Sequence, residues 1–285
     1  LDNNDGLYFS SVRDMDGRTQ VALMDRIAAM YQGTQDPSKP AIILDWGHIT
    51  ASHPEQQGAV GIGGISETEV TARQIEKLAR DKAAQGWAVY FTHTDPGVRK
   101  GNNGTLSDIS KRRENFEEIA KKHNGKAIAV SFHQNYANSS ANGLETYANG
   151  KGYDIAEDYH EVLRATDLIG NVATATSMKD RGVKTKVVSG VLRSNELPII
   201  LLEGGFLDNV DDNKLLRNTD YLDQITASLD VVTERYREQQ WEKAPERNKE
   251  GASIDSNVST RSLASWGRNV DMSKMNWDLV LNPPK

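Results

Sequence analysis

The sequence predicts an α/β protein built on a single twisted, mostly parallel β-sheet with helices on both faces. Two observations favour this fold. Short apolar runs of strand length alternate with longer amphipathic segments, and polar or ionisable residues follow directly on several of the apolar runs. The chain has 285 residues, of which 37% are hydrophobic and 26% charged, and this is the balance of a globular protein.

Composition excludes several classes of partner and site. The formal net charge is −6 and there is no long basic run, so we expect no nucleic-acid-binding surface. The longest apolar stretch, Leu197–Leu202, is far shorter than the roughly 20 residues that cross a bilayer, so we expect no membrane span. Cysteine is absent, and any metal must therefore be held by His, Asp or Glu.

The expected elements fall in order along the chain. Residues 1–39 are expected to form an N-terminal extension with one helix over Thr19–Tyr31. A break rich in proline follows, and the first strand begins at Ala41. Apolar runs predict six strands: Ala41–Asp45, Ala88–Phe91, Ala127–Phe132, Leu144–Ala148, Val187–Val191 and Pro198–Glu203.

Apolar residues at helical spacing predict four helices around these strands: Ser66–Gln85, Leu106–Lys122, Ile155–Ala173 and Asn213–Gln239. All of this alternation lies within residues 40–242, which we expect to be the principal domain. Residues 243–285 are polar at first and end in scattered apolar residues, so we expect a linker and a C-terminal tail.

Metal-binding or ionisable side chains stand at the ends of three predicted strands. These segments are Asp45-Trp46-Gly47-His48, Ser131-Phe132-His133-Gln134-Asn135 and Leu202-Glu203-Gly204-Gly205-Phe206. In open α/β sheets, ligands bind outside the carboxyl ends of the strands. We therefore expect these side chains to meet at one crevice.

Two glutamates add to this group. Ser66-Glu67-Thr68-Glu69 has the form of a capping box, with Ser66 as N-cap and Glu69 reaching back, which leaves Glu67 free for another role. Glu203 closes a strongly apolar strand, and an unpaired buried carboxylate is costly. We therefore expect Glu203 to have a charged or hydrogen-bonding partner, or a role in the chemistry of the site.

Together these residues resemble the zinc-dependent N-acetylmuramoyl-L-alanine amidases of type 3. In that family a strand ends in Asp-Pro-Gly-His, a Glu begins the first helix, Ser-Ile-His-Ala-Asn supplies the second His, and Val-Glu-Leu-Gly-Phe supplies the catalytic Glu. The counterparts occur here in the same order, over roughly residues 40–240. Three further segments also match: Gly143-Leu144-Glu145-Thr146-Tyr147, Arg181-Gly182-Val183-Lys184 and Val191-Leu192-Arg193.

The resemblance implies a zinc metallohydrolase. His48, Glu67 and His133 would bind one Zn²⁺, and two His with one carboxylate is a common ligand set of catalytic zinc. Glu203 would be the catalytic general base. Four further residues are expected to orient the ligands or touch the substrate: Asp45, Asn135, Glu145 and Arg193.

The implied reaction is hydrolysis of the amide between N-acetylmuramic acid and L-alanine in peptidoglycan, in cell-wall remodelling or lysis. The implied location is extracytoplasmic, in the periplasm, in the cell wall or secreted, and a phage lysin fits the same residues. We expect a monomer. The run Lys111-Arg112-Arg113 is expected to form a solvated helix face, and the other four histidines to be structural.

Departures from the family pattern leave two alternatives open. Trp46 replaces the family's Pro, and His93 stands where the family commonly has Arg. One alternative is a zinc peptidase of the carboxypeptidase type, in which Arg193 would clamp a terminal carboxylate. The other is a catalytically silent wall-binding protein, although the three proposed ligands and the base are all present.

Overall fold

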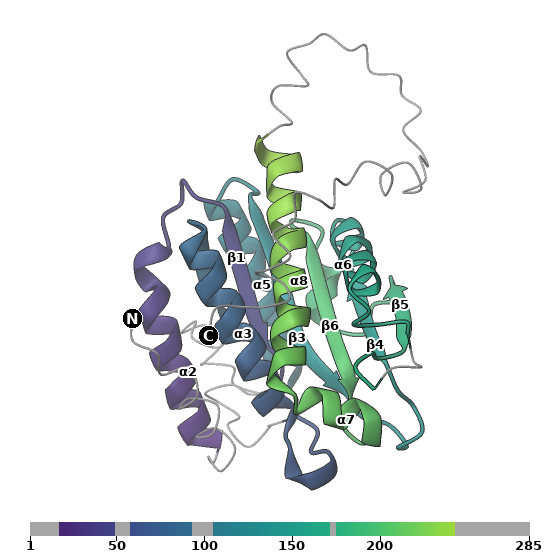
Figure 1. The fold of residues 1–285 in the computed structure, drawn as a ribbon. Helices are drawn as coiled ribbons and strands as arrows, with labels where there is room; N and C mark the ends of the chain where they lie inside the picture. The colour runs from purple at the N-terminus through teal and green to yellow at the C-terminus, as the bar shows by residue number, and fades with distance from the viewer. Residues whose placement is uncertain (1–16, 49–57, 93–104, 172–174, 243–285) are drawn as a thin grey trace, which may run out of the picture. The chain divides into compact units, whose positions relative to one another are not determined.

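Six strands form one sheet in the order β2-β1-β3-β6-β4-β5 in the computed structural model, which describes residues 17–48, 58–92, 105–171 and 175–242 (Figure 1). The β4–β6 pair is antiparallel, and the other neighbouring pairs are parallel. The strands are β1 Ala41–Trp46, β2 Ala88–Phe91, β3 Ala127–Asn135, β4 Leu144–Ala148, β5 Asp180–Lys184 and β6 Ile199–Phe206. The predicted mostly parallel sheet is confirmed.

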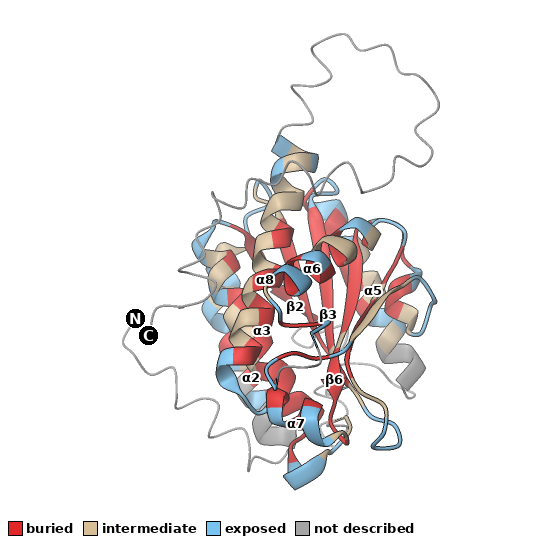
Figure 2. Ribbon diagram, turned by 45° about the vertical axis from the view of Figure 1, so that its right-hand side comes forward, coloured by how far each residue is buried: buried red, intermediate tan, exposed pale blue. Residues whose placement is uncertain are grey.

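Helices cover both faces of this sheet. On one face lie α3 (Glu67–Ala84) and α8 (Thr219–Arg237), with α2 (Gly17–Tyr31) beside α3 and α6 (Tyr153–Ala165) over β4 and β5 (Figures 1 and 2). On the other face α5 (Thr105–Lys122) packs on β1 and β3. The strands are buried between these layers, as the red ribbons of Figure 2 show.

The core on the α5 face explains why the first three strands read clearly in the sequence. Its buried side chains come from alternate positions of the strands, from α5 and from the short helix η4 (Gly190–Arg193). Burial on both sides makes β1 and β2 continuous apolar runs, which is typical of parallel strands. Apolar area removed from water contributes roughly 25 cal/mol per Å² to stability.

The predicted strand over Val187–Val191 is wrong. Val187 and Val188 are exposed, and the next residues form η4. The fifth strand is Asp180–Lys184, a half-buried edge strand with the sequence Asp-Arg-Gly-Val-Lys. Its charged side chains form ion pairs and do not pack in the core, so the sequence has no apolar pattern that would predict this strand.

Two predicted helices are shorter than expected because a polar residue caps or breaks the backbone. The helix expected over Ile155–Ala173 ends at Ala165, and Asp167 then takes a left-handed backbone with φ +55°. The helix expected over Asn213–Gln239 is divided into α7 (Val210–Leu216) and α8. The side chain of Asn218, between them, accepts hydrogen bonds from the backbone N–H of Asp220 and Tyr221.

Residues Glu234–Lys285 form a unit of their own, of which 234–242 are described; they end α8 and add a π-helical turn over Glu238–Glu242. The linker and tail expected over 243–285 lie outside the described residues. Among the helices that the structure describes, none has the length and apolarity needed to cross a membrane.

Asn149 joins the end of β4 to the start of β6. Its buried amide donates to the carbonyls of Ser194 (2.7 Å) and Leu197 (2.9 Å), and its Oδ1 accepts from the N–H groups of Gly152 (2.8 Å) and Ile199 (3.0 Å). One side chain thus satisfies four backbone groups where the end of β4 lies beside the start of the antiparallel strand β6.

We expect Asn149→Ala to lower the free energy of unfolding by about 2–4 kcal/mol, because these buried backbone groups lose their partners. Urea denaturation followed by circular dichroism measures the change. The control is Glu118→Ala on the exposed side of α5, which should change stability by less than about 0.5 kcal/mol. Equal effects of the two substitutions would contradict this account of the β4–β6 connection.

Candidate active site

The structure brings His48, Glu67 and His133 together at the carboxyl edge of the sheet. His48 follows β1, Glu67 is the first residue of α3, and His133 lies in β3. One potential ligand atom from each residue lies within 4.8 Å of the other two. His48 Nε2 is 3.0 Å from Glu67 Oε2, and His133 Nδ1 is 3.0 Å from Glu67 Oε1.

Glu67 is held by the start of α3. Ser66 caps this helix by accepting a hydrogen bond from the backbone N–H of Glu69, as predicted. The Glu67 carboxylate also accepts bonds from the backbone N–H groups of Ala59 (3.1 Å) and Gln134 (2.9 Å). These contacts hold the Glu67 side chain at the carboxyl edge of the sheet.

The surroundings of Glu67 set its charge. Burial by itself raises the pKa of this carboxyl, but hydrogen bonds from His133 and His48 outweigh burial and hold the pKa well below its ordinary value. Glu67 is therefore a carboxylate at neutral pH. An anionic oxygen between two imidazoles is a suitable donor group for a cation.

Backbone geometry before the first histidine is tightly constrained. His48 has φ +65°, a left-handed conformation that is uncommon for a residue other than glycine. Gly47 has no room for a Cβ atom, which would collide with the His133 ring and the Phe132 carbonyl. Glycine at this position lets β1 end close enough to β3 for the two rings to lie 5.0 Å apart.

This donor set fits a zinc-type ion. Zinc in proteins is bound by His nitrogen and carboxylate oxygen at about 2.0–2.2 Å in a tetrahedron, whose ligand atoms are then about 3.3 Å apart. Each histidine nitrogen lies 3.0 Å from a different oxygen of Glu67, so each histidine–carboxylate separation is close to that edge. The His48 side chain is 42% exposed whereas that of Glu67 is 3% exposed, so the cluster opens towards solvent on the His48 side.

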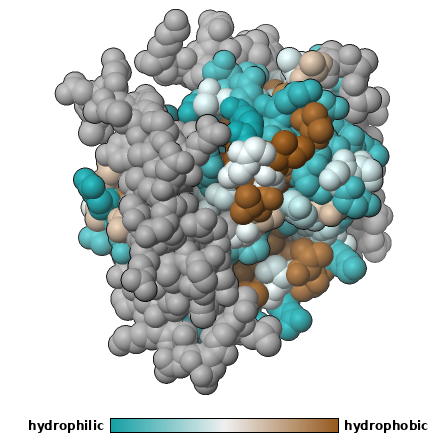
Figure 3. All heavy atoms as spheres, turned by 90° about the horizontal axis from the view of Figure 1, so that it is seen from below, coloured by the Kyte–Doolittle hydropathy of each residue, from teal (hydrophilic) through white to brown (hydrophobic). Residues whose placement is uncertain are grey.

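The surface at this edge carries apolar as well as polar groups. Figure 3, which views the molecule from below, shows hydrophobic patches among hydrophilic residues at this end. Exposed apolar side chains there come from the segment before α3 and from the start of α7, and they include Val60, Ile62 and Val210. The backbone N–H of Ile62 donates to the carbonyl of Leu207, just after β6.

Glu203 lies beside the cluster without a hydrogen-bond partner for one oxygen. It is in register with His133 on β3 and with Glu145 on β4. Its Oε2 is buried, and no described residue hydrogen-bonds to it. Burial raises the pKa of Glu203 to about 7, with further contributions from the negative charges of Glu67 and Glu145.

Asp45 supports the site from beneath, without contacting either histidine ring through a hydrogen bond. Its carboxylate accepts bonds from Thr92 (2.5 Å), Arg112 (2.8 Å) and Ser131 (2.5 Å). Arg112 also donates to the Trp46 carbonyl at 2.5 Å. Burial by itself raises the pKa of Asp45, but Arg112 and the hydroxyls of Ser131 and Thr92 lower it by more. The pKa of this carboxyl is therefore below its ordinary value, and the group is ionised at neutral pH.

The expected solvated face at Lys111-Arg112-Arg113 is therefore only partly correct. Arg112 is buried and forms an ion pair with Asp45, because this position of α5 faces the end of β1. Lys111 is exposed and pairs with Glu114 of the same helix. The pair of Arg112 with Asp45 ties α5 to the strand that leads into His48.

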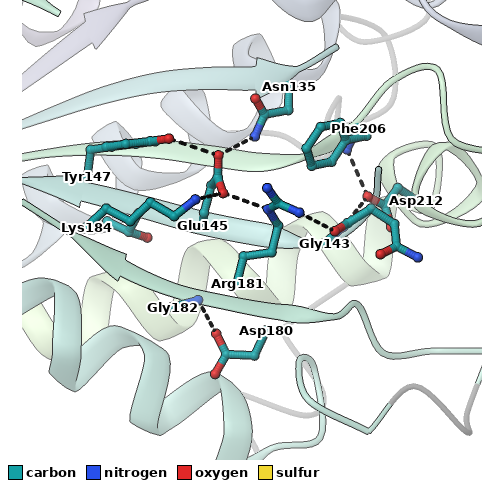
Figure 4. Close-up of polar contacts among 12 residues, drawn as sticks. Asn135, Gly143, Glu145, Tyr147, Asp180, Arg181, Gly182, Lys184, Phe206 and Asp212 are labelled. Atoms are coloured by element: carbon teal, nitrogen blue, oxygen red, sulfur yellow. Dashed lines mark hydrogen bonds and ion pairs between the residues drawn. The ribbon is translucent and has the colours of Figure 1, made fainter. Parts of the chain in front are cut away.

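Asn135 and Glu145 contact each other rather than the histidines. Asn135 Nδ2 donates to Glu145 Oε1 at 3.0 Å, and Tyr147 also donates to this oxygen at 3.1 Å (Figure 4). Arg181 and Lys184 bind Glu145 Oε2. Hydrogen bonds from these cations outweigh burial and lower the pKa of Glu145 to about 2.

Sequence reasoning did not assign Tyr147, Arg181 or Lys184 to the site. Arg181 and Lys184 are three residues apart, and a regular strand would direct their side chains to opposite faces. Arg193, which was expected near the substrate, is exposed at the end of η4 and is not part of the cluster that the described residues form.

The other described histidines lie away from the cluster. His123 is buried against Tyr90 and the Lys39 carbonyl, and His160 is buried between Thr146 and Asp180. Burial lowers the pKa of both rings. Neither belongs to the cluster that the described residues form, and His53 and His93 lie outside those residues.

Comparisons with known proteins agree with this geometry. The N-acetylmuramoyl-L-alanine amidase family, Amidase_3, matches residues 42–230. Over 202 residues the chain is 28% identical to N-acetylmuramoyl-L-alanine amidase LytC of Bacillus subtilis (strain 168), covering 68% of this chain and 35% of that protein. An uncharacterised cell wall amidase of Bacillus anthracis is 35% identical over 153 residues, covering 53% of this chain and 27% of that protein.

Solved structures give the same picture. N-acetylmuramoyl-L-alanine amidase AmiC2 of Nostoc punctiforme has a TM-score of 0.51 and 26% identity, covering 69% of this chain and 96% of that chain. The CwlD amidase of Clostridioides difficile, solved with the GerS lipoprotein, has a TM-score of 0.55 at 24% identity, covering 70% of this chain and 100% of that chain, and it supports the fold. The matched family region contains the cluster, Glu203 and the whole sheet apart from the first residue of β1. The chain belongs to the N-acetylmuramoyl-L-alanine amidase family, Amidase_3.

Proposed function

We propose that this chain hydrolyses the amide between N-acetylmuramic acid and L-alanine in peptidoglycan, with a single Zn²⁺ held by His48, Glu67 and His133. The observation that carries the proposal is the cluster of these three side chains beside Glu203, whose Oε2 is buried and has no hydrogen-bond partner among the described residues. The family match over residues 42–230 supports the choice of bond. The chain spans about a third or less of the first two relatives it matches, so the activity is proposed for this region alone.

The chain's own residues supply binding and proton transfer. When bound, the ion supplies a Lewis acid that polarises a carbonyl and lowers the pKa of water. Glu67 contributes negative charge and is itself fixed by two backbone N–H groups. His48, the more exposed ligand, lies on the side from which substrate approaches.

Glu203 is suited to carry a proton in both directions. A carboxyl with a pKa near 7 is ionised in part at neutral pH, so it accepts a proton from the attacking water and returns it to the leaving nitrogen. The unpartnered Oε2 leaves one oxygen available for this exchange. Glu67 cannot serve in this role, because four donors hold it as an anion.

The proposal extends to substrate, location and domain boundaries. Peptidoglycan would be met outside the cytoplasm, in the cell wall, in the periplasm or after secretion, and relatives named as cell wall amidase and endolysin support this. A phage lysin is compatible with the second of these names. We propose that residues 40–242 contain the catalytic domain, since all four site residues lie within them.

The metal site predicts about one zinc per chain in the purified protein. His133→Ala removes a donor, so zinc content and amidase activity should both fall to background. Elemental analysis measures the zinc, and mass spectrometry of digested peptidoglycan measures stem release. The control is His123→Gln, which alters a buried histidine outside the cluster and should keep its zinc. Full activity after complete removal of metal would rule out the proposal.

Glu203→Gln should separate binding from proton transfer. The side chain keeps its size and the three ligands are untouched, so zinc should remain bound. Activity should fall by roughly 10²–10⁴-fold or more, because the proton acceptor is lost. Glu69→Gln, in the same helical turn as Glu67, is the matched control and should retain most of its activity. Normal turnover by Glu203→Gln would show that the mechanism is wrong.

The raised pKa of Glu203 predicts a pH-dependent stability of the metal-free chain. Its pKa is about 7 in the fold and 4.5 ordinarily, so folding disfavours the ionised form and the fold loses stability as pH rises from about 4.5 to 7. Metal-free Glu203→Gln should exceed metal-free wild type in stability by up to about 3 kcal/mol at pH 8.

At pH 4, Glu203 is protonated in both states, and the two proteins should have nearly equal stability. Urea denaturation at both pH values in chelator measures the difference. A stability difference that is the same at pH 4 and pH 8 would contradict the raised pKa.

A further inference from the structure

Among the described residues, no α-helix packs on β4 and β5 from the α5 side of the sheet, whereas the short helix η4 packs on β6 there. We call the α5 side of β4 and β5 the open half of this face. Helix α5 packs on β1 and β3, whereas α6 packs on β4 and β5 from the opposite side, where its His160 contacts Thr146. Glu145 and Tyr147 alternate with Thr146 and therefore point to the α5 side. Glu203, directly opposite Glu145, points there too, so this open half begins at the proposed catalytic residue.

A bulge in the edge strand brings two cations onto this same face. Between Leu144↔Asp180 and Thr146↔Val183 the register shifts, so β5 holds one residue more than β4. Gly182 lies in the shifted segment with φ +74°, a left-handed conformation that favours glycine. The extra residue allows Arg181 and Lys184 to reach the same Glu145 oxygen, although they are three positions apart.

Each cation is positioned by more than one contact (Figure 4). Arg181 donates through Nε to Glu145 at 2.6 Å and through Nη1 to the Asn142 carbonyl at 3.3 Å, and its guanidinium lies 4.9 Å from the Phe206 ring centroid. Lys184 binds Glu145, and its Nζ lies 5.3 Å from the ring centroid of Tyr147. These contacts reduce the entropy that either side chain would lose on binding a ligand.

Both cations also keep donors for a ligand. Within the described residues, Lys184 Nζ has Glu145 as its one hydrogen-bond partner, so two of its three protons remain. Nη2 of Arg181 has no hydrogen-bond partner there. The side chain of Arg181 is 28% exposed and that of Lys184 is 33% exposed, so these donors are accessible to solvent.

Charge favours an anion. Arg181 and Lys184 bring two positive charges, and Glu145, ionised at neutral pH because its pKa is about 2, brings one negative charge. These three side chains together carry one net positive charge. The nearby carboxyls of Asp212 and Glu203 have pKa values raised by burial, which disfavours their negative forms. The Glu145 oxygens are already bound by four side chains, so Glu145 orients the cations while their outward donors remain free.

Spacing relates this pair to the bond that is cleaved. Strand β4 lies between β6, which carries Glu203, and β5, which carries the two cations. Neighbouring strands are about 4.8 Å apart, so the backbones of β6 and β5 lie about 10 Å apart. The cationic groups of Arg181 and Lys184 reach back to Glu145 on β4 and so lie nearer to Glu203 than the β5 backbone does. An extended peptide advances about 3.4 Å per residue and therefore passes from Glu203 to the two cations within two to three residues.

We propose that Arg181 and Lys184 form a subsite for a carboxylate of the peptide stem, within two to three residues of the cleaved amide. This inference rests on the proposed function, because it takes the peptide of peptidoglycan as the ligand. The stem would lie across the open half of the α5 face with its amide at Glu203. The subsite would then select stems that carry a free carboxylate over stems that carry a carboxamide there.

Binding of the released peptide tests the subsite without any turnover. The probe is the tripeptide L-alanyl-γ-D-glutamyl-L-lysine, which carries free carboxylates on its second and third residues. Two analogues each replace one of these carboxylates with a carboxamide. Calorimetry with the zinc-loaded chain should show about 10-fold weaker binding for one analogue, since a charge-assisted hydrogen bond is lost.

Lys184→Gln should weaken binding of the unmodified tripeptide by about 10-fold and leave binding of that analogue within about 2-fold of wild type. Glu145 keeps its other three partners in this variant. Lys121→Gln, an exposed lysine in the last turn of α5, is the matched control and should bind all peptides as wild type does.

Equal binding of all three peptides by wild type, or equal losses for all three in Lys184→Gln, would overturn the subsite. Cleavage of intact muropeptides by wild type is measured in parallel and reports on the proposed function. A chain that binds the tripeptide with this carboxylate preference but cleaves no muropeptide would contradict the proposed function and still support the subsite.

Discussion

The Glu67 carboxylate is the interaction on which the rest of the site depends. One side chain at the start of α3 joins His48, His133 and two backbone N–H groups from different segments. These contacts require α3 to begin at Glu67, and the N-cap Ser66 fixes that starting point. It also requires space beside the carboxylate, which Gly58 provides, because a Cβ there would collide with Glu67.

Four carboxyls on neighbouring elements illustrate how environment divides chemical roles. Asp45 and Glu67 are each held as anions by several donors, and Glu145 is paired with two cations. Glu203 is buried with an unpartnered oxygen, so its pKa rises to about 7. Pairs of carboxyls whose pKa values are pushed apart in this way are typical of sites that divide charge stabilisation from proton transfer.

The sequence could predict the sheet and the cluster because both depend on patterns that local residues carry. Buried parallel strands read as apolar runs, and His48, His133 and Glu203 stand where those runs meet polar residues. One sequence does not predict that His133 and Glu203 are paired in register. It does predict that both lie at the carboxyl edge of the sheet. The N-cap at Ser66 separated Glu67 from Glu69 for the same local reason.

Features set by non-local contacts could not be predicted. Strand β5 is stabilised by ion pairs and a bulge, so its polar sequence resembles a loop. Arg112 looked like one of three solvated cations until the end of β1 placed Asp45 opposite it. The apolar spacing of the sequence places Asn218 inside a helix, because its capping hydrogen bonds from Asp220 and Tyr221 form only in the folded turn.

X-ray diffraction from crystals of the zinc-loaded protein, recorded on both sides of the zinc absorption edge, tests the central claim most directly. The account predicts one anomalous peak about 2.0–2.2 Å from His48 Nε2, His133 Nδ1 and a Glu67 oxygen, with Glu203 beside it and not bound to it. A peak that lacks any of these three ligands, or that has Glu203 as a ligand, would contradict it.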